Sequence, residues 1–488
     1  MALLEIAKKS LLAAEKYLAL NSLISVQSQP ELLSQVQASQ ERISADSGES
    51  KSSIDGQLIA VKDNICTTDF PTTCASKLLE QYVSPFDATV VRKAKEAGAV
   101  IMGKTNMDEF GMGSHSMYSH FGPVMQSAED GRPARSAGGS SGGSAVAVAT
   151  GMCYAALGTD TGGSVRLPAA YCGIVGFKPS YGMLSRWGVV AYANSLDTLY
   201  DAINGHDDND PTSITPQTRE RIQDRLSRSR RRGQRLAIGY PEEFNLVELD
   251  DPVRDAWENT LAHLNSQSHR IAPVSLPHTK HALSAYYVLA PAEASSNLAK
   301  YDGVRYGYRD PADRSQDGLL FSPTRANFGA EVRRRIIAGA YSLSSEAIDN
   351  YFLKAQSARR IIQRDFSNAF AQPNYLITDN LEEGRGKEGV DVLIAPCSLS
   401  KAPFLEDVKM QKSALDSYVN DVLTVPASLA GIPAICLPVM HGENDPVGIQ
   451  VMAQYGDEET MWEVAKIIEE GLGSGVGSKT QPTNPTVN

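Results

Sequence analysis

The sequence predicts an α/β fold, and three observations lead to that prediction. Short apolar runs typical of buried strands alternate with amphipathic stretches typical of helices. The 488 residues are 42% hydrophobic and 21% charged, which is the composition of a globular protein rather than a disordered one. The 46 Lys and Arg against 57 Asp and Glu give a net charge of −11, which disfavours a dedicated nucleic-acid binder.

The predicted elements can be placed in chain order. Leucines at near-helical spacing, with lysines and glutamates between them, predict an amphipathic helix over the first twenty residues. Short apolar runs predict buried strands at 57–61, 100–102, 236–240 and 390–395. Periodic or small-residue stretches predict helices at 87–97 and from 144 to 151.

These elements are expected to form a single domain over residues 1–472, with N-terminal helices in residues 1–56. An arginine-rich polar excursion is expected at 207–235, and a second polar insertion at 381–389. Residues 473–488 are rich in Gly, Ser, Thr and Pro and are predicted to be disordered.

Cysteine, histidine and hydropathy patterns exclude several classes of protein. Six cysteines without a C-x-x-C pair are too sparse for a disulfide framework, so a reducing compartment is expected. The eight histidines show no metal-ligand spacing, and no metal is predicted. No apolar stretch reaches the roughly 18 to 20 residues that a bilayer requires, so a soluble protein without membrane insertion is expected.

Two features suggest phosphate or tRNA binding but have simpler explanations. The arginines between Arg219 and Arg235 alternate with acids and serines, which is more typical of a solvated helix face and loop than of a tRNA site. Gly98–Thr105 fits the nucleotide-binding pattern G-x-x-x-x-G-K-[ST]. A helix is predicted before it and its apolar middle suits a buried strand, so we reject nucleotide binding there.

Glycine is concentrated between residues 136 and 182 beyond the needs of a turn. The segment holds two Gly-Gly-Ser clusters, at 138–144 and 162–164, separated by a helix of small residues that can bring both loops together. Glycines let a backbone approach a ligand closely and turn its N–H groups inward, as an oxyanion site requires. Hydroxyl groups among such donors favour acyl transfer.

The first cluster also fits G-x-S-x-G, the nucleophile elbow of α/β-hydrolases. That motif needs a strand before it, and residues 127–135 are not strand-like. A flexible glycine-rich loop is the simplest structural alternative. It explains neither the second cluster nor the apolar segments around both clusters, so we favour a catalytic interpretation.

Residues 136–182 resemble the signature of the amidase signature family. Other stretches resemble one branch of that family, whose members supply ammonia within tRNA-dependent amidotransferases. These stretches extend the similarity over most of residues 1 to 470, and they are Val61–Asn64, Gly103–Phe110, Ala292–Leu298, Tyr301–Gly307 and Asn420–Pro426. The resemblance implies the amidase signature fold, a large mixed β-sheet sandwiched between layers of α-helices.

The resemblance assigns the Ser-Ser-Lys triad of the family residue by residue. Ser164 matches the nucleophile, Ser140 the bridging serine and Lys62 the base. This chemistry is sensible, because a serine needs a partner that takes its proton, and burial keeps a lysine neutral enough to do so. The oxyanion would be held by backbone N–H groups of the second cluster, those of Thr161, Gly162, Gly163 and Ser164.

The same branch binds glutamine, whose carboxylate and ammonium need opposite charges. Arg335 matches the residue for the α-carboxylate and Asp421 the residue for the α-amino group, with Tyr286 as a third candidate. Arg334 is the alternative to Arg335. For each charge taken alone, an ordinary surface salt bridge is the simpler explanation.

By resemblance, the chain is the glutaminase component of a carbon–nitrogen ligase that takes its nitrogen from glutamine. Ser164 would attack the carboxamide, ammonia would leave, and water would hydrolyse the glutamyl ester. A B subunit would use ATP with Mg to phosphorylate the glutamate of Glu-tRNA(Gln), would hold most of the tRNA, and would use the ammonia. A small third subunit would complete a heterotrimer, and this chain itself would bind no cofactor.

Two other functions remain open at this stage. A stand-alone amidase acting on a small or hydrophobic amide is the main alternative. An inactive assembly subunit is the third, because about 15 residues that relatives carry after Asp197 are absent, enough for a turn and most of a short helix. A mispredicted exon junction would explain that gap.

This gap and the insertion at 381–389 suggest a eukaryotic gene, with a fungus as one candidate source. A eukaryotic version would lie in the mitochondrial matrix, although the first helix is a poor transit signal.

Overall fold

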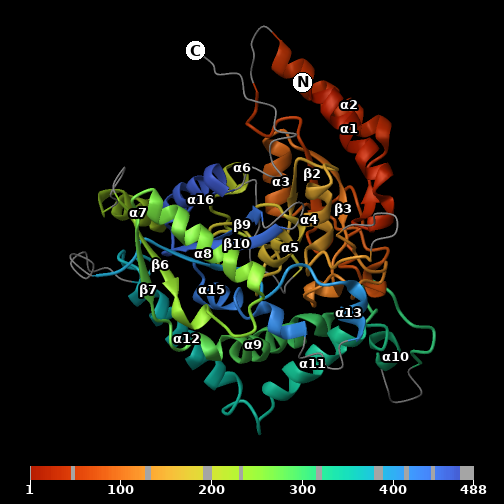
Figure 1. Ribbon diagram of the computed structural model, residues 1–488. Coiled ribbons are helices and arrows are strands. Elements are labelled where there is room, and N and C mark those ends of the chain that lie inside the picture. Colours follow the sequence, from red (N-terminus) through yellow and green to blue (C-terminus); the bar gives the residue numbers. More distant parts are fainter. Residues whose placement is uncertain are drawn as a thin grey trace.

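Helices and strands alternate along the chain in the computed structural model (Figure 1). The structure describes residues 2–45, 50–126, 133–190, 200–229, 235–314, 321–377, 388–410, 417–440 and 446–472. The strands are β1 (Leu23–Val26), β2 (Leu58–Lys62), β3 (Val100–Thr105), β4 (Ala155–Leu157), β5 (Gly176–Lys178), β6 (Ala237–Pro241), β7 (Arg270–Val274), β8 (Val392–Pro396), β9 (Ala434–Met440) and β10 (Pro446–Ala453). The helices are α1 (Leu3–Lys16), α2 (Gln29–Ser44), α3 (Thr89–Glu96), α4 (Gly142–Ala149), α5 (Arg166–Cys172), α6 (Tyr200–Ile203), α7 (Pro216–Ser229), α8 (Asp251–Ser266), α9 (Ala282–Asn297), α10 (Ser322–Arg325), α11 (Ala330–Ser342), α12 (Phe352–Ala369), α13 (Leu405–Met410), α15 (Val425–Ala430) and α16 (Glu458–Leu472).

A four-stranded sheet in the order β1-β3-β2-β4 carries the first half of the site. β2 runs parallel to both β3 and β4, and β1 pairs antiparallel with β3. β2 and β3 are buried along their whole length, which explains why both read as nearly continuous apolar runs. Lys62 is the last residue of β2 and therefore emerges where parallel strands end.

A six-stranded sheet in the order β5-β9-β10-β8-β6-β7 forms the second half of the molecule. Its central strands β9, β10 and β8 pair antiparallel, whereas β6 is parallel to both β8 and β7. Cys436 of β9 packs against α5, while its neighbours Ile435 and Leu437 join the cluster that includes α16. Because successive side chains of a strand point to opposite faces, α5 and α16 cover opposite faces of this sheet.

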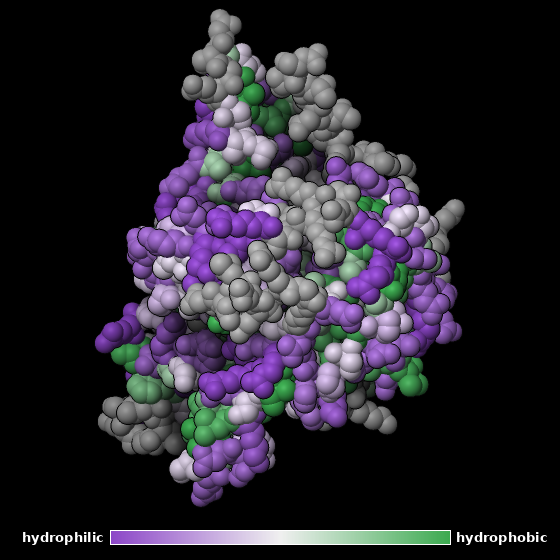
Figure 2. Space-filling view, turned by 90° about the vertical axis from the view of Figure 1, so that its left-hand side faces the viewer, coloured by the Kyte–Doolittle hydropathy of each residue, from purple (hydrophilic) through white to green (hydrophobic). Residues whose placement is uncertain are grey.

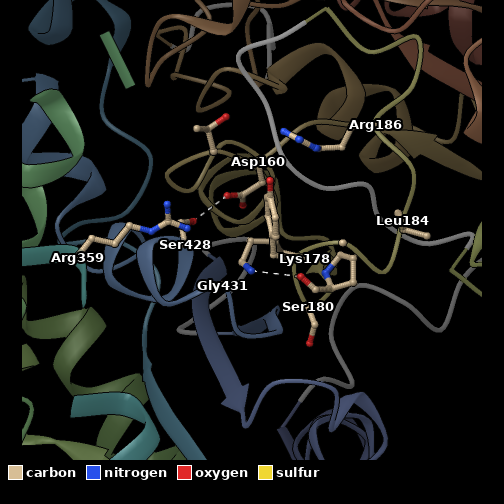
Figure 3. A pocket seen from close by; sticks show the side chains of 12 residues that line it. Asp160, Lys178, Ser180, Leu184, Arg186, Arg359, Ser428 and Gly431 are labelled. Carbon is tan, nitrogen blue, oxygen red and sulfur yellow. Dashed lines mark hydrogen bonds between the residues drawn. The ribbon is translucent and has the colours of Figure 1, made fainter. Parts of the chain in front are cut away.

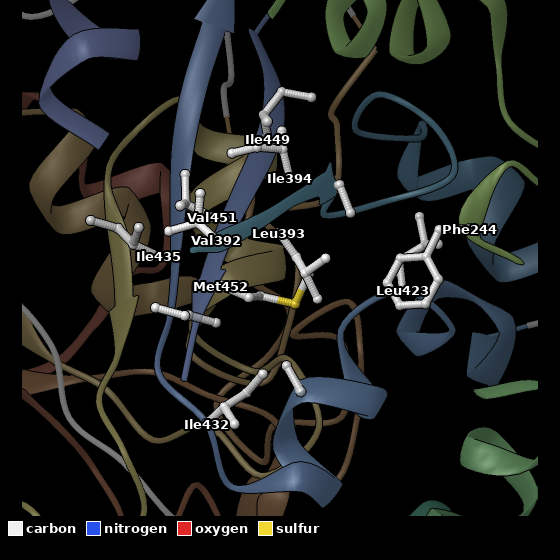
Figure 4. Packing of buried hydrophobic residues seen from close by; sticks show 14 of the residues in the cluster. Phe244, Val392, Leu393, Ile394, Leu423, Ile432, Ile435, Ile449, Val451 and Met452 are labelled. Atoms are coloured by element: carbon white, nitrogen blue, oxygen red, sulfur yellow. The ribbon is translucent and has the colours of Figure 1, made fainter. Parts of the chain in front are cut away.

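The largest hydrophobic cluster fills the space beside this sheet (Figure 4). Val392, Leu393 and Ile394 of β8 and Ile449 and Val451 of β10 are all fully buried. Burying such a side chain contributes about 1.5 to 3 kcal/mol relative to leaving it in water. The sheet is therefore a rigid support for the loops and helices that lead from its edges.

The α/β architecture predicted from the sequence is confirmed, and the described strands fall into two sheets. The predicted strands correspond to β2, β3, β6 and β8, and the predicted helices to α1, α3 and α4, each within about two residues at most ends. Gly98–Thr105 includes the whole of β3, and Lys104 is buried, with its ammonium donating to Ile65 O (2.9 Å) and Thr72 Oγ1 (3.0 Å). The segment is therefore a buried strand, as the sequence predicted.

The prediction of a solvated arginine face is wrong for part of α7. Arg221 donates to Tyr375 O at 3.5 Å, and the guanidinium of Arg225 lies over the Tyr375 ring. Arg219 donates through its guanidinium to the carbonyl oxygens of Ile214 (2.8 Å), Gly182 (3.0 Å) and Met183 (2.8 Å), so it fastens α7 to the rest of the chain. Arg228 does behave as predicted, because it is exposed and pairs with Asp224 one turn earlier. The polarity of the sequence alone did not distinguish arginines that contact the rest of the protein from arginines exposed to solvent.

Three predictions concern residues outside those described, namely the gap after Asp197, most of the insertion at 381–389, and the tail at 473–488. The six cysteines are buried, and none of them forms a disulfide. Within the described ranges, no helix combines the length and apolar character that a membrane crossing needs. Figure 2 shows a face on which hydrophilic side chains predominate and hydrophobic ones gather in small patches.

Candidate active site

Lys62 lies at the centre of the site, fully buried at the end of β2. Its Nζ is 2.7 Å from Ser140 Oγ, 2.7 Å from Ser141 Oγ and 3.4 Å from the carbonyl oxygen of Thr159. The structure thus brings the predicted base and the predicted bridging serine into direct contact, although 78 residues separate them in the chain.

Burial lowers the pKa of Lys62 to about 7, because desolvation disfavours the charged ammonium. The carboxylates of Asp108 and Asp160 oppose this shift, since each stabilises the positive charge. A lysine with such a pKa is neutral in about half of the molecules at pH 7, so it can accept a proton from a hydroxyl.

The neighbours of Lys62 determine how its neutral form is oriented. The Ser141 hydroxyl donates to Thr159 O (3.2 Å), so toward Lys62 it can only accept. A neutral lysine has two N–H donors and one lone pair. If the donors bond to Ser141 Oγ and to Thr159 O, the lone pair is directed at Ser140, the geometry that proton transfer from Ser140 requires.

Ser140 belongs to a loop that glycines allow to pack closely. A Cβ at Gly143 would lie 2.3 Å from the carbonyl oxygen of Asn106, and a Cβ at Gly142 would lie 2.4 Å from Ser116 Oγ. Only glycine fits both positions, which explains the first Gly-Gly-Ser cluster. α4 begins at Gly142, so the loop ends in a buried helix that fixes Ser140 and Ser141.

The second loop joins β4 to α5 and carries Ser164. A buried ion pair holds its base, because Arg166 donates from Nε to Asp160 Oδ2 (3.0 Å) and from Nη2 to Asp160 Oδ1 (3.1 Å). Gly163 has a φ of +137°, a conformation that favours glycine. The Ser141 N–H donates to Ser164 O at 3.1 Å and so joins the two loops.

The hydroxyl of Ser164, which is half-buried, makes no hydrogen bond to another described residue. The predicted bond from Ser164 to Ser140 is therefore not formed in this structure, and Ser140 Oγ accepts from Lys62 instead. The backbone contact between Ser141 and Ser164 nevertheless holds the two serine-bearing segments side by side.

The predicted oxyanion donors differ in their partners. The N–H of Gly163 donates to Asp160 Oδ1 at 2.9 Å, which directs it away from a substrate. The N–H groups of Gly162 and Ser164 donate to no other described residue. The geometry therefore favours the N–H groups of Gly162 and Ser164 as oxyanion donors. The N–H of Gly163 instead stabilises the loop, a role that the sequence did not indicate.

Arg335, on α11, is 4% exposed, and its Nε donates to Glu331 Oε1 at 2.7 Å. Arg334 also contacts Glu331, but its side chain is 49% exposed and lies on the outer side of the helix. The two candidates for the carboxylate partner are thus distinguished by burial, and Arg335 is the one in the interior.

Asp421 is buried at the end of the 3₁₀ turn η7 (Val419–Asp421), where its carboxylate accepts hydrogen bonds from Tyr287 OH (2.8 Å) and Ser114 Oγ (3.1 Å). Burial raises its pKa to about 6, against the opposing effects of the Tyr287 bond and the positive charge of Arg335. The guanidinium carbon of Arg335 lies 5.1 Å from the centre of the Tyr287 ring. A buried cation and a buried anion thus both contact Tyr287.

Tyr286 lies against the second loop rather than against either charge. A Cβ at Gly162 would meet the phenol ring of Tyr286 at 2.7 Å, so the ring covers that glycine. Thr424, three residues after Asp421, donates from Oγ1 to Gly162 O at 2.6 Å. The structure therefore brings Lys62, the two loops, Tyr286, Arg335 and Asp421 into one region.

A cavity of about 50 Å³ borders the second loop at Asp160 and Thr161 (Figure 3). Lys178, Arg186 and Arg359 line it, and burial lowers the pKa of Lys178 to about 7. Ser164 is not among its lining residues, although Thr161, a predicted oxyanion donor, is. No group of three or more His, Cys, Asp or Glu side chains arranged for a metal occurs in the described part of the chain.

Comparisons with known proteins agree with this arrangement. A family model described as Amidase matches residues 5–461. The chain belongs to the amidase family. Its relatives include the A subunit of the mitochondrial glutamyl-tRNA(Gln) amidotransferase of Coccidioides posadasii, 52% identical over 96% of this chain and 99% of that protein. The corresponding protein of Emericella nidulans is 53% identical over 89% of this chain and 92% of its own length.

Solved structures of the amidase family share this fold. The A subunit of the glutamyl-tRNA(Gln) amidotransferase of Thermotoga maritima has a TM-score of 0.71 and 34% identity, covering 96% of this chain and 91% of that one. A structure described as an amidase has a TM-score of 0.71 and 26% identity over 97% of both chains. The resemblance that the sequence predicted, to the amidase family and to its glutamyl-tRNA(Gln) amidotransferase branch, is confirmed.

Sequence reasoning missed several residues of this amidase site, chiefly those that act through another side chain. These are Asp108, Ser141, Asp160, Arg166, Tyr287, Glu331 and Tyr418. Ser141 and Asp160 belong to the glycine-rich segment 136–182. They could have been predicted, because a catalytic lysine needs a partner that orients it and a glycine-rich loop needs a partner that holds it in place. Glu331 lies four residues before Arg335 on α11, a spacing that places the two side chains next to each other once the helix is known.

Proposed function

We propose that this chain is the glutaminase subunit of a mitochondrial glutamyl-tRNA(Gln) amidotransferase, releasing ammonia from glutamine for the conversion of Glu-tRNA(Gln) to Gln-tRNA(Gln). The observation that carries this proposal is the pair of buried opposite charges, Arg335 and Asp421, that both contact Tyr287. Such a pair suits an α-amino acid, because its carboxylate and ammonium lie on one carbon. The relatives at about half identity are named for this enzyme, which supports the same conclusion.

In the proposed reaction, Ser164 Oγ attacks the side-chain carbonyl carbon of glutamine. Its proton passes through Ser140 to Lys62, which Ser140 already contacts at 2.7 Å. N–H groups of the second loop, those of Thr161, Gly162 and Ser164, stabilise the oxyanion, with Gly163 shaping the loop. Lys62 then returns the proton to the departing amine through Ser140, ammonia leaves, and water hydrolyses the glutamyl ester.

Glutamine would be held by its α-groups, with its carboxylate on Arg335 and its ammonium on Asp421. Because Nε of Arg335 is bonded to Glu331, the carboxylate would meet the other edge of the guanidinium. Tyr286 would close the site over Gly162.

The remaining steps would take place outside this chain. A B subunit would bind ATP and Mg, phosphorylate the glutamate on the tRNA and receive the ammonia, and a small third subunit would complete the complex. The net charge of −11 fits this division, because the tRNA phosphates would meet mainly the partner. This chain would bind no cofactor of its own.

The test compares two nitrogen donors on one preparation of assembled complex. Arg335→Ala removes a charge-assisted contact worth on the order of 3 kcal/mol, so glutamine-dependent formation of Gln-tRNA(Gln) should fall roughly a hundredfold. Asp421→Ala should act in the same direction. Ammonia supplied directly bypasses the glutamine site, so the ammonia-dependent reaction should persist in both variants.

Equal loss with either nitrogen donor would contradict this proposal, because Arg335 and Asp421 would then hold the fold or an interface with a partner rather than glutamine. A stand-alone amidase for a hydrophobic amide would have no use for a buried charge pair, and it would turn over amides without partner subunits. If the chain were an inactive assembly subunit, the wild-type complex would form Gln-tRNA(Gln) from ammonia but not from glutamine.

A further inference from the structure

Two tyrosines from distant parts of the chain stack beside the charge pair. Tyr287 lies on α9 and Tyr418 directly precedes η7, and their ring centres are 4.0 Å apart with the planes inclined by 18°. Figure 1 shows α9 and α11 running next to each other in the lower part of the molecule. We call Tyr287 and Tyr418 the tyrosine pair.

Each hydroxyl of the tyrosine pair donates to a different carboxylate. Tyr287 OH donates to Asp421 Oδ2 at 2.8 Å, and Tyr418 OH donates to Glu331 Oε1 at 2.7 Å. Glu331 Oε1 also accepts from Arg335 Nε at 2.7 Å. One hydroxyl thus reaches the anion of the charge pair directly, and the other reaches the cation through Glu331.

The rings themselves face the cation. The guanidinium carbon of Arg335 lies 5.1 Å from the centre of Tyr287 and 5.3 Å from that of Tyr418, within the range of cation–π attraction. A phenylalanine would retain this attraction and the stack while losing the hydroxyl bond. The two contributions can therefore be separated by substitution.

We propose that the tyrosine pair consists of positioning residues that fix Arg335 relative to Asp421, and thereby select substrates carrying an ammonium and a carboxylate on one carbon. This inference rests on the proposed function of the site and names what gives it specificity. The pair joins α9, α11 and η7, so the separation of the two charges is set by stacked rings rather than by flexible side chains.

The group whose titration reports this arrangement is Asp421. It is faced by Tyr287 from α9, by Arg335 from α11 and by Ser114 from the segment after the 3₁₀ turn η3 (Glu109–Gly111), with Asp160 as a further negative charge. His115 lies beside Asn420, and burial lowers its pKa to about 4, so it stays neutral over the pH range of interest.

The experiment measures KM and kcat for glutamine hydrolysis against pH in the assembled complex. KM should rise as the pH falls through the pKa of Asp421, about 6, because a protonated carboxyl no longer attracts the ammonium. In Tyr287→Phe the ionised carboxylate loses a donor, its pKa rises, and the KM increase should begin at a pH higher by roughly half a unit or more. At pH 7 its KM should rise about tenfold with kcat little changed.

Tyr418→Phe supplies the contrast, because it loses the bond to Glu331 and keeps the bond between Tyr287 and Asp421. Its KM should rise with a much smaller shift along the pH axis than in Tyr287→Phe, because Tyr418 acts on Asp421 only through the position of Arg335. Tyr301→Phe, a change at a buried tyrosine of another hydrophobic cluster, is the matched control and should leave KM, kcat and their pH dependence unchanged.

An unmoved KM profile in Tyr287→Phe, or the same shift in Tyr418→Phe, would overturn this inference alone. If the wild-type complex fails to hydrolyse glutamine through Ser164, the proposed function itself falls. Thermal unfolding of each variant shows whether a loss comes from the fold rather than from the charge pair.

Discussion

Lys62, the proposed proton acceptor, allows a quantitative prediction. An exposed lysine, with a pKa near 10.4, is neutral in about one molecule in 2,500 at pH 7. Burial lowers the pKa of Lys62 to about 7, which raises that fraction to about one half. The gain in neutral base is roughly a thousandfold, equivalent to about 4 kcal/mol in the activation free energy if the base is required in the rate-limiting step.

We therefore expect kcat for glutamine hydrolysis to increase with pH as a single proton is lost near pH 7, and to level off above pH 8. At pH 6 about one tenth of Lys62 is neutral, so kcat should be about one fifth of its value at pH 7. Asp108 stabilises the ammonium form of Lys62, so Asp108→Asn should lower the pKa of Lys62 and move the rise of kcat to lower pH. The assay is steady-state release of ammonia between pH 5.5 and 9, with buffers matched in ionic strength.

Lys62→Arg completes this prediction, because arginine keeps its charge and cannot act as a base. It should be as damaging as Lys62→Ala. Substantial activity in the arginine variant, or a kcat that does not change between pH 6 and 8, would refute the role of Lys62 as proton acceptor. If the rise of kcat moved to higher pH in Asp108→Asn, the electrostatic explanation of the Lys62 pKa would be refuted.

Two further predictions concern the serines. Ser164→Ala should abolish glutamine hydrolysis, and a slow glutamine analogue should label Ser164 in the wild type; mass spectrometry showing the label on Ser140 or Ser141 would identify the first loop as the source of the nucleophile. Ser141→Ala removes one of the acceptors that orient neutral Lys62, so kcat should fall about tenfold with KM unchanged. An unchanged kcat in this variant would mean that Thr159 O suffices to orient the base.

The parts of the site that the sequence made predictable are those in which local geometry demands a residue type. Gly142 and Gly143 are required because any Cβ there would collide with a neighbouring segment. Lys62 follows an apolar run, and such a run predicts a buried strand and a lysine with a lowered pKa at its end. These signals lie within a few residues of the functional group itself.

The parts that could not be predicted depend on contacts between distant segments. Tyr287 and Asp421 are 134 residues apart, and Ser114 and Asp421 are 307 residues apart. No spacing rule connects such positions. The hydrogen bond from the Gly163 N–H to Asp160 could not be predicted either, because the sequence does not show in which direction a peptide unit of a glycine-rich loop points.

In the proposed function, the arrangement around Thr424 would couple glutamine binding to the position of the nucleophile. Thr424 lies in the short segment that also carries Asp421, and its hydroxyl holds Gly162 O at 2.6 Å. A Cβ at Gly163 would lie 2.1 Å from Thr424 Oγ1, so the segment and the second loop are in direct contact. If Asp421 binds the ammonium of glutamine as proposed, it therefore places the carboxamide relative to a loop whose position is already set. Binding of the α-groups then contributes to the chemical step through orientation, which is why loss of either charge should impair glutamine use and spare the reaction with free ammonia.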